Sequence, residues 1–451
     1  MLTGKALGQG LWHATGVSEK TFSLAQKCIE RLGEAWSRVD DLVLANQAKV
    51  LDGFIREKIS LAHMWPSTGY GYQDAGRDGL EKLYARIFGG EASLVRLHWA
   101  SGTHVLKTVL FSVLRPGDEL LSVTGTPYET LWPIIGMRER PANTDRDSRG
   151  APSSPGSLLN FGIYYRETPC LLEFEENKID AAELERSLAQ HISRQTKAIF
   201  IQRSRGYSRR KSISTGTLRK FMEIMDRRYP DILTIVDNCY CEFTDTVEPP
   251  ALGISMTAGS LIKNPGGGLA PAGGYVVGKE DCVRRVAEAL YAPGLSGEVG
   301  SNPYGYRDLY QGLFLAPKVV GEALKGASFA ALFFHELGFD VSPGPFDQRS
   351  DIVQSITLGS AERLKGFVRG IQTASPVDSY VTPEPWDMPG YEHEVIMAAG
   401  TFVQGSSIEL SCDAPFVPPY TAYLQGGLTK EHVIIACMRA KEALENGGLL
   451  S

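Results

Sequence analysis

Three features are missing from this sequence: a long apolar run, a surplus of positive charge and a regular spacing of cysteines. No stretch of about 18 apolar residues is present to cross a membrane, and residues 1–5 lack the basic and then apolar layout of a secretory signal. We therefore expect a cytoplasmic protein that does not act at a membrane. Its formal net charge of -6 gives no chain-wide positive field for a phosphate backbone, so nucleic acid is not an expected partner.

The cysteines do not form a disulfide framework. They are odd in number and scattered, at positions 28, 170, 239, 241, 282, 412 and 437, which predicts reduced thiols. Cys239 and Cys241 form a Cys-x-Cys pair, but no second Cys or His pair lies at a spacing typical of zinc sites. The sequence therefore predicts no metal site, and packing is the simpler role for this pair.

The length and composition are those of a globular protein with more than one compact unit. The chain has 451 residues, of which 43% are hydrophobic and 22% are charged. Between Ser18 and about Leu61, apolar residues recur every three or four positions, which predicts a helical N-terminal arm over residues 1–65. The polar segment 140–157, rich in proline, glycine and serine, predicts a mobile surface loop.

From about residue 94 to residue 290, short apolar runs alternate with helical patterns. This alternation predicts an α/β fold with a mostly parallel central sheet in a large domain, residues 66–316, whose ligands lie at the carboxyl ends of the strands. After Pro317 we expect a long helix through Phe334 and then a smaller α+β domain, completing residues 317–451. The runs predicted to be strands are Glu119–Val123, Ala198–Ile201, Ile232–Val236, Ser260–Ile262 and Gly274–Val277.

Two of these predicted strands end beside residues suited to catalysis. Asp237 follows Ile232–Val236, and a carboxylate there stays ionised only when a positive group faces it, such as a protonated pyridine nitrogen. Lys263 ends a later short strand among small residues, where desolvation weakens its preference for the charged form and makes it a nucleophilic amine. Ser260 is placed to donate its hydroxyl to a phosphate. Taken alone, Asp237 is an ordinary turn residue and Lys263 an ordinary surface lysine.

Two further elements are expected at the same sheet edge. Ser101-Gly102-Thr103 open a helical run whose first amides and hydroxyls suit an anion, although a helix cap is the simpler explanation. Tyr128 follows the next strand, where its ring can stack on a pyridine and its hydroxyl can move protons; a buried structural tyrosine is the alternative. Lysine, aspartate, phosphate site and tyrosine together predict pyridoxal 5'-phosphate (PLP) as the cofactor, held by Lys263 as a Schiff base.

The motifs around these residues resemble a known family. They include Ser-Gly-Thr-His (101–104), Ile-Gln-Arg-Ser-Arg-Gly-Tyr-Ser (201–208), Val-Asp-Asn-Cys-Tyr (236–240) and Gly-Ser-Leu-Ile-Lys-Asn-Pro-Gly-Gly-Gly (259–268). With further motifs between about residues 45 and 445, they resemble the aluminium-resistance or methionine gamma-lyase-like proteins of the cystathionine lyase group. The resemblance implies the fold-type-I PLP-dependent transferase fold, with a large cofactor domain and a smaller C-terminal one.

The resemblance also implies an assembly. A homotetramer built from two dimers is expected, with each active site at a subunit interface. In the wider group a tyrosine and a basic residue of the neighbouring subunit hold the phosphate. By position, Tyr70 matches the tyrosine, Tyr72 stands where the basic residue is usual, and Arg77 could supply the missing charge. A structural turn is the alternative for this glycine–tyrosine run.

The residues expected to contact the substrate depart from the family pattern. Where the pattern has an Arg-Glu pair before Pro-Tyr, this chain has Val417-Pro418, which implies a more apolar pocket. Arg203, Arg205 and Arg307 are candidates to bind a substrate carboxylate, since a guanidinium is a planar bidentate donor; a structural or surface role is the alternative for each.

The resemblance implies β- or γ-elimination of a substituent, sulfur or else halide, from an amino acid. One alternative is the conversion of a γ-halogenated unsaturated amino acid to an alkynyl product in a specialised pathway. An aminotransferase and a non-catalytic PLP-binding protein also remain alternatives.

Overall fold

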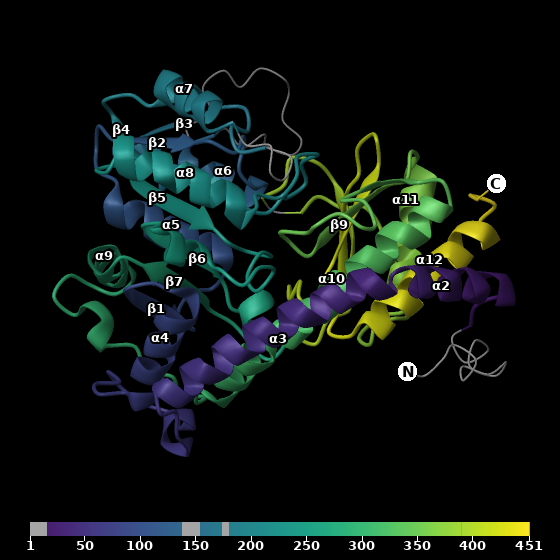
Figure 1. The fold of residues 1–451 in the computed structure, drawn as a ribbon, viewed down its shortest axis with the longest axis horizontal. Helices are drawn as coiled ribbons and strands as arrows, with labels where there is room; N and C mark the ends of the chain where they lie inside the picture. The colour runs from purple at the N-terminus through teal and green to yellow at the C-terminus, as the bar shows by residue number, and fades with distance from the viewer. Residues whose placement is uncertain (1–15, 138–153, 174–179, 389, 451) are drawn as a thin grey trace. The chain divides into compact units, whose positions relative to one another are not determined.

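The computed structural model of the chain describes residues 16–137, 154–173, 180–388 and 390–450. It divides into two compact units: residues 45–316, and the described parts of residues 1–44 and 317–451 (Figure 1). Most of the loop predicted at 140–157 lies outside the described residues. Within the part of the chain that the structure describes, no helix is long and apolar enough to cross a membrane.

The larger unit is built on a seven-stranded sheet with the order β1-β7-β6-β5-β4-β2-β3. The strands β3, β2, β4, β5 and β6 run parallel, and β7 is antiparallel to both of its neighbours. Parallel strands require crossovers, which the chain supplies as helices. The strands are β1 (Ala92–Arg96), β2 (Glu119–Ser122), β3 (Tyr164–Glu167), β4 (Thr196–Gln202), β5 (Leu233–Asp237), β6 (Met256–Ser260) and β7 (Gly274–Gly278).

Helices cover both faces of this sheet (Figure 1). Neighbouring residues of one strand enter different cores, as Phe200 and Ile201 of β4 show. One core joins the sheet to α5 (Gly102–Val113), α6 (Trp132–Ile135) and α9 (Glu280–Leu290), and the other joins it to α7 (Ala181–His191) and α8 (Thr215–Arg228). α4 (Ala75–Phe88) packs beside β1 and β7. The alternation of apolar runs and helical patterns therefore predicted the layers correctly.

The second unit contains a five-stranded antiparallel sheet with the order β10-β11-β12-β9-β8. Its core combines this sheet with α2 (Glu19–Arg31), α10 (Arg307–Glu336), α11 (Ala361–Gln372) and α12 (Lys430–Asn446). The strands are β8 (Asp340–Ser342), β9 (Val353–Thr357), β10 (Val395–Ala398), β11 (Ser411–Pro415) and β12 (Thr421–Gln425).

Two helical boundaries differ from those expected. The N-terminal arm is two helices, because α2 ends at Arg31 and α3 covers Gly33–Arg56. The long helix begins at Arg307 rather than at Pro317, which lies inside it. Proline removes one amide donor and disfavours a helix interior, yet the first turns of α10 form ahead of Pro317.

Candidate active site

Asp237 is the last residue of β5, at the carboxyl edge of the parallel strands. It pairs with Gln202 at the end of β4 in the sheet register. Its side chain is 8% exposed, and its Oδ1 accepts a hydrogen bond from the amide of Cys239 at 3.1 Å. Burial raises the pKa of Asp237, and the charge of Lys263 opposes that rise. A buried carboxyl group thus stands at the strand end where the sequence placed it.

The turn after Asp237 is held by a buried polar network. Arg203 Nη1 donates to Asn238 Oδ1 at 2.9 Å, and Asn238 Nδ2 donates to Glu248 Oε2 at 3.1 Å. Arg203 Nε also donates to the carbonyl of Ile213 at 3.1 Å. Arg203 is 1% exposed, and its bond to Asn238 fixes the neighbour of Asp237.

Lys263 does not end a strand. β6 ends at Ser260, and Lys263 precedes a short 3-10 turn, Asn264–Gly266. The strand predicted over Ser260–Ile262 is therefore wrong. The amide of Lys263 donates back to the carbonyl of Ser260 at 3.4 Å, and Pro265 has no amide hydrogen for a sheet ladder.

The lysine turn packs directly on the backbone of α10. A Cβ atom on Gly312 would lie 2.2 Å from the carbonyl oxygen of Gly266, and one on Gly267 would lie 2.4 Å from the carbonyl oxygen of Gly312. Gly267 also has a φ of 54°, in the left-handed region that favours glycine. Only glycines permit this approach, and it fixes the turn that carries Lys263.

The amine of Lys263 lies among acidic and aromatic groups. Its Nζ is 4.0 Å from the centre of the Tyr240 ring. Burial disfavours the charged amine, but Cys239, Tyr240 and Asp237 outweigh burial and raise the pKa of Lys263. The expectation that desolvation would weaken the charged form is therefore wrong for this structure, because the strand-end turn surrounds the amine with acidic groups.

The start of α5 lies against the same region. A Cβ atom on Gly102 would stand 3.5 Å from Cβ of Ser260 and 3.7 Å from Sγ of Cys239. Gly102 of α5, Ser260 of β6 and Cys239 after β5 are therefore neighbours. Three segments that are far apart in the sequence meet at one corner of the sheet edge.

The first turn of α5 has the features of an anion site. Ser101 is the N-cap, and its hydroxyl accepts the amide of His104 at 3.1 Å. The hydroxyls of Thr103 and Thr130 lie 2.8 Å apart, within hydrogen-bond distance. The first amides of a helix have no partner within the helix and lie at the positive end of its dipole, so they suit a phosphate.

Tyr128 is tied to the end of β4. Its amide donates to Gln202 Oε1 at 2.6 Å, and Gln202 is the register partner of Asp237. Its hydroxyl donates to the hydroxyl of Tyr207 at 3.1 Å. Tyr128 thus belongs to the same edge as Asp237, as the order of the strands predicted.

Tyr70 and Tyr72 lie on the surface of the larger unit. They are 70% and 59% exposed, with ring centres 5.5 Å apart. Arg77 is 2% exposed, and its Nη1 donates to the carbonyls of Gly71 at 2.8 Å and Glu298 at 3.2 Å. In this chain Arg77 therefore supports the loop that displays the two tyrosines.

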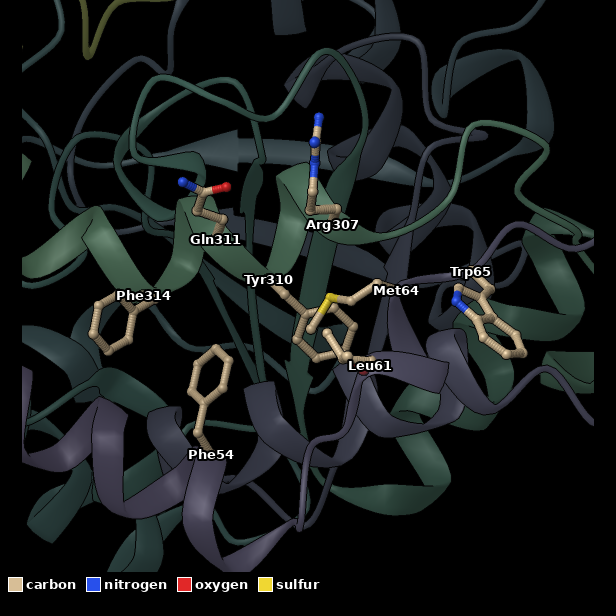
Figure 2. Close-up of a pocket in the computed structure, with 8 residues that line it drawn as sticks. All are labelled: Phe54, Leu61, Met64, Trp65, Arg307, Tyr310, Gln311 and Phe314. Carbon is tan, nitrogen blue, oxygen red and sulfur yellow. The ribbon is translucent and has the colours of Figure 1, made fainter.

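The two other candidate arginines, Arg205 and Arg307, differ in exposure. Arg205 is 2% exposed and donates to the backbone of its own loop, at Ser208 and Arg209, both at 3.3 Å. The Arg307 side chain is 76% exposed and lines a groove of about 480 Å³ (Figure 2). The other residues lining this groove are Phe54, Leu61, Met64, Trp65, Tyr310, Gln311 and Phe314.

Val417 lies in the turn between β11 and β12, in the second unit. Its amide donates to the carbonyl of Pro415 at 2.9 Å, and its carbonyl accepts the amide of Tyr420 at 2.8 Å. The side chain is partly buried. The turn is built by its backbone hydrogen bonds, so the residue at 417 is free to vary in polarity without breaking them.

The sequence interpretation missed Tyr240 and Glu242 near the lysine, and Tyr207 beside Tyr128. Tyr240 lies in the motif that carries Asp237, but its φ of 73° decides where the ring points. Glu242 is fully buried, and its Oε1 accepts the hydroxyl of Tyr275 at 2.7 Å. An acidic residue two positions after a Cys-Tyr pair was the available signal for Glu242; nothing in the sequence paired Tyr207 with Tyr128.

These groups fit the chemistry of PLP. A buried carboxyl at Asp237 suits a protonated ring nitrogen, the amine of Lys263 suits the aldehyde, and the start of α5 with Ser260 suits the phosphate. The close approach of Gly102 to Ser260 and Cys239 brings the start of α5 beside the end of β6 and the turn after β5. Among the described residues, no three His, Cys, Asp or Glu side chains are grouped to hold a metal ion.

The fold and the site define a PLP-dependent enzyme of fold type I. The PLP-dependent protein YhfS of Escherichia coli shares this fold at 14% identity, with a TM-score of 0.59 over 90% of this chain and 97% of that one. This similarity shows the fold alone. It confirms the predicted class: a mostly parallel α/β sheet with a smaller second domain.

The chain belongs to the methionine gamma-lyase family, whose sequence profile matches residues 21–445. The uncharacterized protein YnbB of Bacillus subtilis is 44% identical over 407 residues, which cover 90% of this chain and 92% of that protein. A carbon-sulfur lyase involved in aluminum resistance from Clostridium novyi is 42% identical, with a TM-score of 0.86 over 98% of this chain and 99% of that one. The resemblance stated from the motifs is confirmed, and at this level the chain is a PLP-dependent lyase.

Proposed function

We propose that this protein eliminates a substituent from Cβ or Cγ of an amino acid, with Lys263 as the lysine that holds the cofactor. The observation that carries the proposal is the position of the Lys263 amine, 4.0 Å from the Tyr240 ring, within the field of the Asp237 carboxyl group. Family membership supports elimination, and the relative from Clostridium novyi is named a carbon-sulfur lyase. Sulfur is therefore our first choice of leaving atom.

Each residue at the site has a defined task in this proposal. When bound, PLP supplies a carbonyl for the substrate amine and a ring that withdraws electrons from Cα. The amine of Lys263 would remove the Cα proton, and the carboxyl group of Asp237 would hold the ring nitrogen. The first turn of α5 and Ser260 bind the phosphate, and Tyr128 gives a proton to the leaving atom.

The proposal includes the assembly expected from the sequence. We propose a homotetramer of two dimers in which Tyr70, with Tyr72 beside it, reaches the phosphate of the neighbouring subunit. The high exposure of both rings in a single chain supports this. A cytoplasmic location and a small amino-acid substrate complete the proposal, and both stay predictions from the sequence.

The leaving group remains open to halides as well as to sulfur. Val417 replaces a charged residue of the family pattern, and an apolar side chain there favours a substrate without a charged distal group. Elimination from a γ-halogenated unsaturated amino acid, which would give an alkynyl product, is therefore included among the substrates to be tested.

A panel of amino acids tests the proposal. The purified protein, supplied with PLP, is incubated without an amino acceptor with amino acids bearing thiol, thioether, hydroxyl or halide groups at Cβ or Cγ. We expect ammonia and a keto acid from at least one sulfur-bearing member, and loss of both products in Lys263→Ala. Turnover that requires an added keto acid would indicate an aminotransferase, and no product from any member would indicate a non-catalytic PLP-binding protein; either result would overturn the proposal.

A further inference from the structure

The loop between β4 and α8 is folded on itself at the edge of the sheet. Arg210 Nη2 donates to the carbonyl of Gln202 at 2.7 Å, and the amide of Ile213 donates to the carbonyl of Arg203 at 2.8 Å. Arg210 is 9% exposed, so the bond to the strand end is shielded from water. These bonds fix the segment between Arg203 and Ile213, which displays Tyr207.

Within this loop, Tyr207 meets Tyr128. The two hydroxyl oxygens are 3.1 Å apart, and the ring centres are 5.3 Å apart with an angle of 66° between the planes. This edge-to-face geometry holds both rings by attraction between a positive ring edge and a negative ring face. Since the backbone amide of Tyr128 also donates to Gln202, this residue is held at its backbone by β4 and at its hydroxyl by the loop that follows β4.

We propose that Tyr207 is a positioning residue that holds the hydroxyl of Tyr128 and shares its proton during elimination. The inference rests on the proposed function, in which Tyr128 gives a proton to the leaving atom. A phenylalanine at 207 would keep the ring contact but remove this hydrogen bond.

The proton balance is simple for a sulfur leaving group. The electron pair left on the neighbouring carbon when its proton is removed forms a carbon–carbon double bond, and the carbon–sulfur bond breaks with its own electron pair going to sulfur. The O–H bond of Tyr128 breaks as its proton moves to sulfur to form a thiol. The oxygen of Tyr128 is then negative, and Tyr207 turns its own O–H toward it. A hydrogen bond to a charged oxygen is about twice as strong as one between neutral groups, so Tyr207 stabilises Tyr128 most when the proton has left. Water then returns a proton to Tyr128.

The test compares Tyr207→Phe with the wild-type holoenzyme on the best sulfur substrate of the panel. We expect kcat to fall about tenfold, KM to change less than about threefold, and the alkaline limb of the pH profile to shift upward. Tyr164→Phe, at a half-exposed tyrosine of β3, is the matched control and should leave all three values unchanged. If Tyr207→Phe matches Tyr164→Phe in kcat and pH profile, the inference is wrong.

A double-variant cycle separates positioning from a general effect on the fold. If Tyr207 acts through Tyr128, the variant with both tyrosines changed to phenylalanine should be no slower than Tyr128→Phe alone. Independent, multiplying losses in kcat would overturn the inference, because Tyr207 would then act without Tyr128.

A titration of the cofactor-free protein separates this inference from the proposed function. The rise of tyrosinate absorbance with pH should begin at a lower pH in the wild type than in Tyr207→Phe, because Tyr207 stabilises ionised Tyr128. A wild type that turns over no amino acid but shows this difference would refute the proposed function and retain the pairing. Identical titrations of the two proteins, apart from the one missing tyrosine, would refute the pairing.

Discussion

The substitution Glu242→Gln should change how stability depends on pH. Glu242 is fully buried, and Tyr275 donates to its Oε1 at 2.7 Å. Its Oε2 has no hydrogen-bond partner among the described residues. Burial raises the pKa of Glu242 from 4.5 to about 8, although the hydrogen bond from Tyr275 and the charge of Lys263 oppose the rise. At neutral pH the buried carboxyl is therefore mostly protonated.

The sign and size of the effect follow from proton linkage. A group whose pKa is higher in the folded protein favours folding fully below its unfolded pKa, and this advantage is lost as the pH rises through the folded value. Between 4.5 and about 8, each pH unit costs about 1.4 kcal/mol, so the total cost of Glu242 approaches about 5 kcal/mol at alkaline pH. Between pH 6 and pH 8 the wild type should lose about 2 kcal/mol through this group.

Urea unfolding of the cofactor-free protein and of Glu242→Gln, measured at several pH values, checks this prediction. The amide keeps the oxygen that accepts from Tyr275, and its own burial cost does not change with pH, so the difference between the two stability curves isolates the titration. Glu30→Gln, at an exposed position of α2, is the control for the substitution itself. Infrared absorption of a protonated carboxyl that disappears near pH 8 in the wild type alone is a second readout. Parallel stability curves from pH 6 to pH 8 would refute the reasoning.

Two further predictions concern the surroundings of the lysine. Ser101→Ala should destabilise the protein by about 1 kcal/mol, measured by urea unfolding, because the hydroxyl that accepts the amide of His104 is lost. Ser101→Asp should keep this cap but weaken PLP binding, measured by cofactor titration, because its carboxylate repels the phosphate. Equal PLP affinity of Ser101→Asp and wild type would contradict the phosphate assignment. Gly259→Ala would place a Cβ atom 2.7 Å from Cε1 of Tyr275 and 2.8 Å from Oε1 of Glu242. We therefore expect the free energy of unfolding to fall by roughly 1–3 kcal/mol. An unchanged urea midpoint would show that the packing around Gly259 is looser than in the structure.

The sequence predicted the features that depend on short-range patterns. Apolar runs that alternate with helical periods located β2, β4, β5 and β7 of the large sheet, and the end of one such run located Asp237, whereas β1 and β3 were not among the predicted runs. The helix cap at Ser101 could be predicted because serine is strongly preferred at the N-cap position. The edge of the sheet was predictable because parallel strands present their carboxyl ends together.

Features that depend on contacts distant in the sequence could not be predicted in this way. Arg203 was open to several roles until the fold paired it with Asn238, 35 residues further on. The pKa of the Lys263 amine depends on Asp237 and the turn after it. The small residues beside Lys263 in the sequence suggested a lowered pKa, whereas these distant groups raise it. Tyr207 lies in a loop without periodicity, and its position depends on long-range bonds such as that of Arg210 to the end of β4.

The contact between the lysine turn and α10 also limits how this protein can evolve. A side chain added at Gly267 would meet the carbonyl of Gly312, and one added at Gly312 would meet the carbonyl of Gly266, so neither has space unless the other segment moves. Substitutions at Gly267 and Gly312 are therefore not independent. Any change in the course of the lysine turn would therefore require a matching shift of the first turns of α10.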